Sequence, residues 1–129
     1  MFLQWTQPTT SRRSLDRYVD STTTPAADIL DDGDSYQVIL EMPGVTQEGL
    51  SIQLEARELV IRGERPVYEK DAKLVYASRS LGSKLEKRFS LGEDVERSAV
   101  TANLENGLLT VTLPRKAEVK ARKIEVEVK

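Results

Sequence analysis

The chain has 129 residues, the length of one domain with short extensions, and this is enough to bury a core without metal or disulfide. Lys and Arg number 19 against 21 acidic residues, a net charge of -2, so charge gives no reason to expect a nucleic acid or membrane partner. Neither Cys nor His occurs, which excludes thiol catalysis, cysteine-ligated zinc and the commonest general base. We expect no metal, no cofactor and no enzymatic activity.

The start of the chain lacks the charged segment and apolar stretch of a secretory signal. No run in the sequence approaches the roughly 20 apolar residues that a membrane span requires. We therefore expect a soluble, cytoplasmic protein.

Residues 1–24 differ from the rest, because isolated apolar side chains are dispersed among Ser, Thr, Arg and Gln. Leu15, Tyr18 and Val19 are spaced for one or two amphipathic turns, which alone are too short for a stable helix in water. Phe2 and Trp5 either fold back onto the core or belong to a mobile arm, and their sparse polar surroundings favour the arm.

Apolar and polar residues alternate repeatedly between residues 25 and 114, as they do in half-buried antiparallel strands. The clearest runs are residues 35–41, 50–55, 58–62, 100–105 and 109–113. Turn residues separate the runs, and Asn106-Gly107 is a strong signal for a tight hairpin. Many short strands without a long helical period predict an all-β fold, an immunoglobulin-like antiparallel β-sandwich.

Two segments do not fit a minimal sandwich. A loop of about twenty residues between Arg65 and Lys84 is long for a compact domain, and residues 74–76 could form a short strand inside it. The charged tail ends in an apolar stripe of alternate residues, Ile124, Val126 and Val128. The stripe forms either a last edge strand of the same domain or a segment that reaches a neighbour.

Three apparent motifs are weak. Residues 44–49 have the glycine spacing of a phosphate loop, but Leu50 replaces the lysine that would reach the phosphates. The acidic stretch around Gly33 lacks oxygen ligands at positions where a calcium loop needs them. Asp31 and Asp32 are interpreted as turn residues rather than as a catalytic pair. The sequence therefore contains no constellation that predicts catalysis or metal binding.

Residues 102–109 match the A-x-x-x-N-G-hydrophobic-L signature of the small heat-shock proteins. Ile124-Glu125-Val126 stands where that family carries its C-terminal I-x-I/V anchor. At Lys87 the family usually has an arginine, whose planar bidentate contact lysine cannot copy. Over residues 25–126 the sequence resembles this family, the α-crystallin domain of bacterial type, and further motifs occur in the family's order at residues 25–29, 42–45, 59–65 and 88–91.

The resemblance implies a flexible N-terminal arm at residues 1–24, the sandwich at residues 25–114 and a C-terminal extension at residues 115–129. It implies an ATP-independent holding chaperone that binds partly unfolded proteins and suppresses their aggregation under stress. The expected partners are unfolded or misfolded client proteins and further copies of the chain, as a homodimer or a higher oligomer. Nucleic acid and membranes are not expected partners.

The resemblance also assigns residues to four roles. The client-binding residues would be Phe2, Leu3, Trp5, Leu15, Tyr18 and Val19. Strand exchange in a dimer would use Ala27, Ile29, Leu74, Val75 and Tyr76. The anchor would consist of Ile124 and Val126. It would fill a groove on a neighbouring dimer that is lined by Leu50, Ile52, Leu54, Val100, Ala102 and Leu104.

Two other classes share a sandwich fold. A co-chaperone module of the CS-domain type would lack both the long loop and the terminal anchor, and this chain has both. An enzyme or a ligand-binding sandwich is the third alternative, and screening for ligands or turnover without client would distinguish it.

Overall fold

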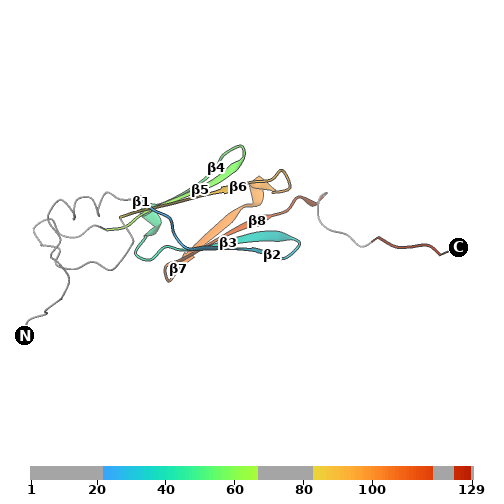
Figure 1. Cartoon of the computed structure of the whole chain (residues 1–129), viewed down its shortest axis with the longest axis horizontal. Helices are drawn as coiled ribbons and strands as arrows, with labels where there is room; N and C mark the ends of the chain where they lie inside the picture. Colours follow the sequence, from blue (N-terminus) through green and yellow to red (C-terminus); the bar gives the residue numbers. More distant parts are fainter. Residues whose placement is uncertain (1–21, 67–82, 118–123, 129) are drawn as a thin grey trace, which may run out of the picture.

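The computed structural model describes residues 22–66, 83–117 and 124–128, in which two β-sheets pack face to face (Figure 1). One sheet, sheet A, has the strand order β1 (Thr22–Thr23), β6 (Lys84–Ser90), β5 (Glu58–Glu64) and β4 (Leu50–Leu54). The other, sheet B, has the order β2 (Ala27–Asp31), β3 (Ser35–Glu41), β8 (Leu108–Pro114) and β7 (Thr101–Glu105). Short 3-10 helices precede β4 and β7, namely η1 (Gln47–Gly49) and η2 (Arg97–Ala99). The predicted β-sandwich is confirmed.

The alternation of apolar residues accounts for the core. Side chains that point inward from the central strands of the two sheets meet between them and are almost completely buried. From sheet B they are Val38, Leu40, Leu109, Val111 and Leu113, and from sheet A they are Leu59, Ile61 and Leu85. Within the described ranges, no helix has the length and apolar character that a membrane crossing would require.

The predicted hairpin at Asn106-Gly107 joins β7 to β8. Both residues have positive φ, 51° for Asn106 and 77° for Gly107, as a two-residue turn between twisted strands requires. A Cβ at Gly107 would also lie 3.3 Å from Pro43 Cα. Glycine is therefore required there both for the turn and for the close approach of the neighbouring loop.

The carboxylates of Asp31 and Asp32 accept hydrogen bonds from backbone amides of the turn between β2 and β3, as the pattern predicts for turn residues. Asp31 Oδ1 accepts a hydrogen bond from the amide of Gly33 at 2.9 Å. Asp32 Oδ1 accepts from the amides of Asp34 at 2.9 Å and Ser35 at 2.8 Å. The two amide bonds to Asp32 lower the pKa of its carboxyl, and the bond from the Ser35 amide is the largest cause.

Two features of sheet A differ from a simple alternating pattern. β1 pairs with β6 in parallel, whereas every other strand pair in the described sheets is antiparallel. Val60 occupies an outward position between Gln53 and Arg88 in the register, yet it is completely buried. Alternation alone therefore does not predict every buried side chain of this sheet.

Candidate assembly site

β2 forms one edge of sheet B and carries two residues of the predicted strand exchange. It pairs with β3 on one side, and among the described residues no strand pairs with its other side. Ala27 and Ile29 stand opposite Leu40 and Val38, so both face the inside of the sandwich. Ile29 is nevertheless 57% exposed, and Leu30 is 51% exposed. An unpaired edge with exposed apolar side chains is a place where another strand can add.

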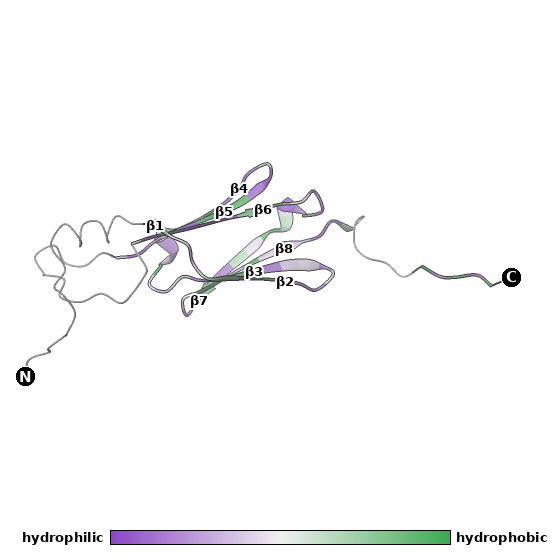
Figure 2. Ribbon diagram, in the orientation of Figure 1, coloured by the Kyte–Doolittle hydropathy of each residue, from purple (hydrophilic) through white to green (hydrophobic). Residues whose placement is uncertain are grey.

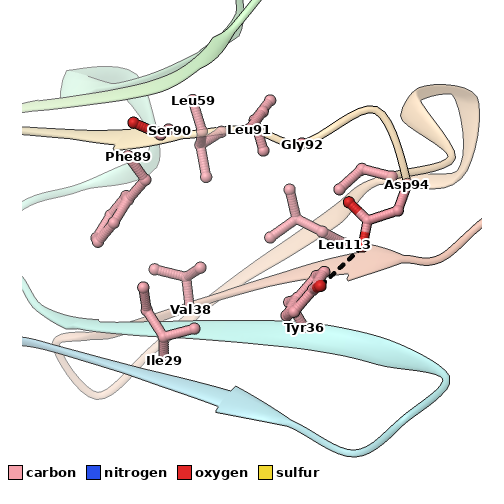
Figure 3. Close-up of a pocket in the computed structure, with 11 residues that line it drawn as sticks. Ile29, Tyr36, Val38, Leu59, Phe89, Ser90, Leu91, Gly92, Asp94 and Leu113 are labelled. Carbon is pink, nitrogen blue, oxygen red and sulfur yellow. Dashed lines mark hydrogen bonds between the residues drawn. The ribbon is translucent and has the colours of Figure 1, made fainter.

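A cavity of about 320 Å³ opens between the two sheets beside β2 (Figure 3). Side chains from the two sheets point toward one another across it, and most of them are apolar. An apolar side chain that became fully buried there would gain about 1.5–3 kcal/mol. The residues that line it include Ile29, Tyr36 and Val38 from sheet B and Leu59, Phe89 and Leu91 from or next to sheet A.

Tyr36 and Asp94 line the same cavity and belong to a polar cluster with Arg115. The Tyr36 hydroxyl donates to Asp94 Oδ2 at 2.7 Å, the contact drawn in Figure 3. Arg115 Nη2 donates to the Tyr36 hydroxyl at 2.9 Å and to Asp31 Oδ2 at 2.6 Å. The hydrogen bond to Tyr36 is the largest cause that raises the pKa of Arg115. The cluster ties the ends of β2, β3 and β8 to the loop after β6.

The predicted anchor groove lies between β4 and β7, which are edge strands of the two sheets. Arg97 of η2, directly before β7, donates to Glu55 O at 2.6 Å and to the carbonyl oxygen of Ala56 in the β4–β5 turn. The turn after β4 is thus held against the segment that leads into β7. Among the six predicted groove residues, Ala102 is exposed. The other five are half-buried and pack against the core, namely Leu50, Ile52, Leu54, Val100 and Leu104.

The apolar stripe of the tail is exposed. Residues 124–128 form no strand, and the exposed fractions of Ile124, Val126 and Val128 are 78%, 84% and 93%. Figure 2 shows hydrophobic and hydrophilic colours along this segment. These five residues therefore do not form the last edge strand of the same domain, which was one of the two alternatives from the sequence. Their apolar surface is available to another chain.

The outer face of sheet A is charged, in contrast to the edges. Glu86 forms ion pairs with Arg62 at 3.2 Å and with Arg88 at 3.3 Å. Arg88 also pairs with Glu58 at 3.0 Å, and this hydrogen bond is the largest cause that raises the pKa of Arg88. Exposed pairs of this kind contribute only about 0–1 kcal/mol each. Their main effect is to keep this face polar and strongly hydrated.

Several predicted site residues lie outside the described residues, namely Phe2, Leu3, Trp5, Leu15, Tyr18 and Val19 of the arm and Leu74, Val75 and Tyr76 of the long loop. Lys87, the departure from the family pattern, has its Nζ 5.5 Å from the centroid of the Phe89 ring, which is a cation–π distance.

Sequence reasoning missed the cluster around Arg115. Its only local signal is a cation directly after Pro114 at the end of a strand.

The fold defines a β-sandwich whose β2 edge and tail expose apolar side chains, which suit it to binding other chains. The family model "Hsp20/alpha crystallin family" matches residues 28–129. The chain therefore belongs to this family, the small heat-shock proteins. Proteins of this family act as chaperones in stress responses, form oligomers and bind client proteins, and they are not known as enzymes.

Individual relatives agree with this assignment. The chain is 32% identical over 120 residues to "18 kDa antigen 2" of Mycobacterium avium, covering 88% of this chain and 86% of that protein. It is 32% identical over 111 residues to "Small heat shock protein C4" of Rickettsia felis, covering 84% and 68%. Among solved structures, heat shock protein 16.0 of Schizosaccharomyces pombe matches with a TM-score of 0.66 and 26% identity, covering 83% of this chain and 99% of that one.

Proposed function

We propose that this protein is an ATP-independent holding chaperone of the cytoplasm, which binds partly unfolded proteins under stress and suppresses their aggregation. The observation that carries the proposal is the contrast between surfaces of one small domain. The β2 edge and the tail expose large apolar side chains, whereas the outer face of sheet A is covered by ion pairs. The apolar β2 edge and tail provide surface for clients, while the polar outer face of sheet A limits indiscriminate self-association.

The N-terminal arm supplies the proposed client contacts. Its apolar residues are Phe2, Leu3, Trp5, Leu15, Tyr18 and Val19. Each fully buried side chain contributes at most about 1.5–3 kcal/mol, and ordering the arm offsets part of that gain. One arm therefore binds weakly and reversibly, and several arms on one oligomer add avidity. The unfolded surface of the client drives the binding, so nucleotide has no role in it.

We assign dimerisation to the β2 edge. A strand formed by Leu74, Val75 and Tyr76 of one copy would pair with β2 of its partner. The exposure of Ile29 and the cavity beside it support this assignment, because an added strand would cover both. The same pairing would give hydrogen-bond partners to the edge of sheet B.

The tail is the proposed link between dimers. Ile124 and Val126 are two positions apart, so in an extended segment both point to one side and can enter the β4–β7 groove together. Two aliphatic side chains supply roughly 3–6 kcal/mol before ordering costs, which corresponds to millimolar binding or somewhat tighter. Such a joint opens easily, and subunits would exchange.

Isolation of a chaperone–client complex tests the function. A thermolabile client is heated with the protein in the absence of nucleotide, and the soluble fraction is separated by size exclusion. We expect the client to elute with the protein at a mass above that of either one alone. If the client is found only in the pellet, as in a control with an unrelated β-sandwich protein, the proposed function is wrong.

A further inference from the structure

Three segments that are distant in the sequence meet at Arg115, the first residue after β8. Its Nη2 bonds Asp31 at 2.6 Å and Tyr36 at 2.9 Å, and its Nη1 donates to Gly33 O at 3.2 Å. Its Nε lies 3.7 Å from Asp94 Oδ2, within ion-pairing distance. The side chain therefore joins the end of β8 to the β2–β3 turn and to the loop after β6.

The contacts use the particular shape of a guanidinium group. The Cζ of Arg115 lies over the ring of Tyr36, 4.5 Å from the ring centroid, while the nitrogens of the group bond three acceptors. Only 16% of the side chain is exposed. A lysine has one point charge and no planar fork, so it could not make the cation–π contact and the divergent hydrogen bonds together.

The main chain is held at the same place. The amide of Arg115 donates to Asp34 O at 2.9 Å, and the amide of Lys116 donates to Asp94 O at 2.8 Å. Val95 forms a β-bridge with Arg115, next to the bond from the Glu96 amide to the carbonyl of Pro114. The path of the chain is thus fixed from both sides as far as Lys116.

A fixed exit limits where the anchor can go. Ile124 follows Lys116 by eight positions, so even a fully extended chain carries it at most about 26–29 Å from there. Within so short a reach, the direction in which the extension leaves the sandwich decides which grooves are accessible. A loose exit would let the same anchor reach grooves in more orientations.

We propose that Arg115 is a positioning residue, which fixes the exit direction of the C-terminal extension and thereby restricts the geometry in which the anchor joins dimers. The restriction on assembly rests on the proposed role of Ile124 and Val126 as an anchor. The fixed exit itself does not depend on that role. The two parts can therefore be tested separately.

The first experiment measures the exit in the absence of docking. The chain has no cysteine, so spin labels can be placed at two exposed positions, Glu105→Cys on β7 and Ala117→Cys, two positions after Arg115. The distance distribution is recorded by electron–electron double resonance with Ile124→Ser and Val126→Ser present and labelled chains diluted by unlabelled ones. We expect a narrow distribution with Arg115, a broad one with Arg115→Ala and an intermediate one with Arg115→Lys. Equal widths would overturn the proposal.

The second experiment measures assembly with the anchor intact, using native mass spectrometry. Arg88→Lys is the matched control, because it changes another ion-paired arginine, on the outer face of sheet A, but keeps the charge of that face. We expect Arg115→Ala to spread the oligomers over additional sizes and Arg88→Lys to leave the wild-type distribution unchanged. An unchanged distribution in Arg115→Ala would overturn the restriction on assembly. If Ile124→Ser with Val126→Ser leaves the oligomer size unchanged, the anchor assignment is wrong. The widths of the spin-label distance distributions still decide whether Arg115 fixes the exit direction.

Discussion

The Tyr36 hydroxyl donates a hydrogen bond to Asp94 Oδ2 at 2.7 Å, and this bond joins β3 of sheet B to the loop that follows β6 of sheet A. The same hydroxyl accepts from Arg115 Nη2 at 2.9 Å. One oxygen atom thus connects the two layers of the sandwich to the start of the C-terminal extension. Both of its bonds involve a charged group, which makes them stronger than neutral hydrogen bonds.

Tyr36→Phe should lower the free energy of unfolding by about 1–3 kcal/mol, because it removes both bonds and leaves partners of a half-buried cluster unsatisfied. Urea unfolding followed by circular dichroism measures the change. Ser98→Ala is the matched control, since it removes an exposed hydroxyl bond to Glu96 and should cost less than about 0.5 kcal/mol. Equal effects of the two substitutions would show that the cluster does not tie the sheets together.

Acid should destabilise the β2–β3 turn through Asp32. Its pKa lies below the ordinary value of 3.8, mainly because the amide of Ser35 donates to the carboxylate. The unfolded chain therefore binds more protons than the folded chain as the pH falls past that value. The stabilisation from this carboxylate is present above pH 3.8 and is lost as the pH falls through the lower, folded pKa.

Asp32→Asn keeps an oxygen acceptor but removes the charge, so we expect a shallower fall in the free energy of unfolding below about pH 4 than in the wild type. Urea unfolding at a series of pH values measures the slope. Asp28→Asn, on the exposed strand β2, removes a charge without touching the turn and serves as the control. An acid slope in Asp32→Asn as steep as that of the wild type would contradict the assignment.

Alternation in the sequence predicts the central strands well, because one face of each is buried and the other is wet. Residues 35–41 are β3 from end to end, and the run at residues 109–113 lies within β8. β6 has no such pattern, since the inward positions Leu85 and Phe89 flank Lys87. A lysine on the inner face interrupts the apolar period that would have indicated this strand.

The candidate site was only partly predictable for a different reason. The exposed edge with Ile29 and the exposed stripe from Ile124 onward follow from local patterns and the family's motifs. The Arg115 cluster does not, because Tyr36 and Asp94 are 79 and 21 positions away from Arg115 and meet it only through the sheet register. A contact between a turn, a loop and a strand end leaves no period in the sequence.

The arm can be tested apart from the sandwich. Replacing Phe2, Leu3 and Trp5 by Ser should weaken client protection without changing the stability of the domain, because these residues precede the first described strand. Titration of each protein against a fixed amount of heated client gives the ratio needed for half protection. Gln4→Ser with Gln7→Ser is the control for an altered but equally apolar arm. An unchanged ratio in the triple variant would move client binding to the edges of the sandwich.

The tail has its own prediction. Ile124→Ser with Val126→Ser should leave a folded dimer and abolish larger assemblies, because most of the apolar surface of the joint is lost. Glu125→Ser with Glu127→Ser changes the intervening residues and should leave assembly intact. Multi-angle light scattering at two concentrations measures the masses. If the wild type and the Ile124 and Val126 variant are equally large, the anchor assignment is wrong.

Suppression of client aggregation without nucleotide is the most direct test of the holding function. A thermolabile client is heated alone, with the protein, and with the protein plus ATP and Mg²⁺, and the scattered light is followed over time. We predict that the protein lowers the scattering to the same extent with and without ATP, in proportion to its ratio to client. Scattering equal to that of the client alone, or suppression only when ATP is present, would contradict the proposed function.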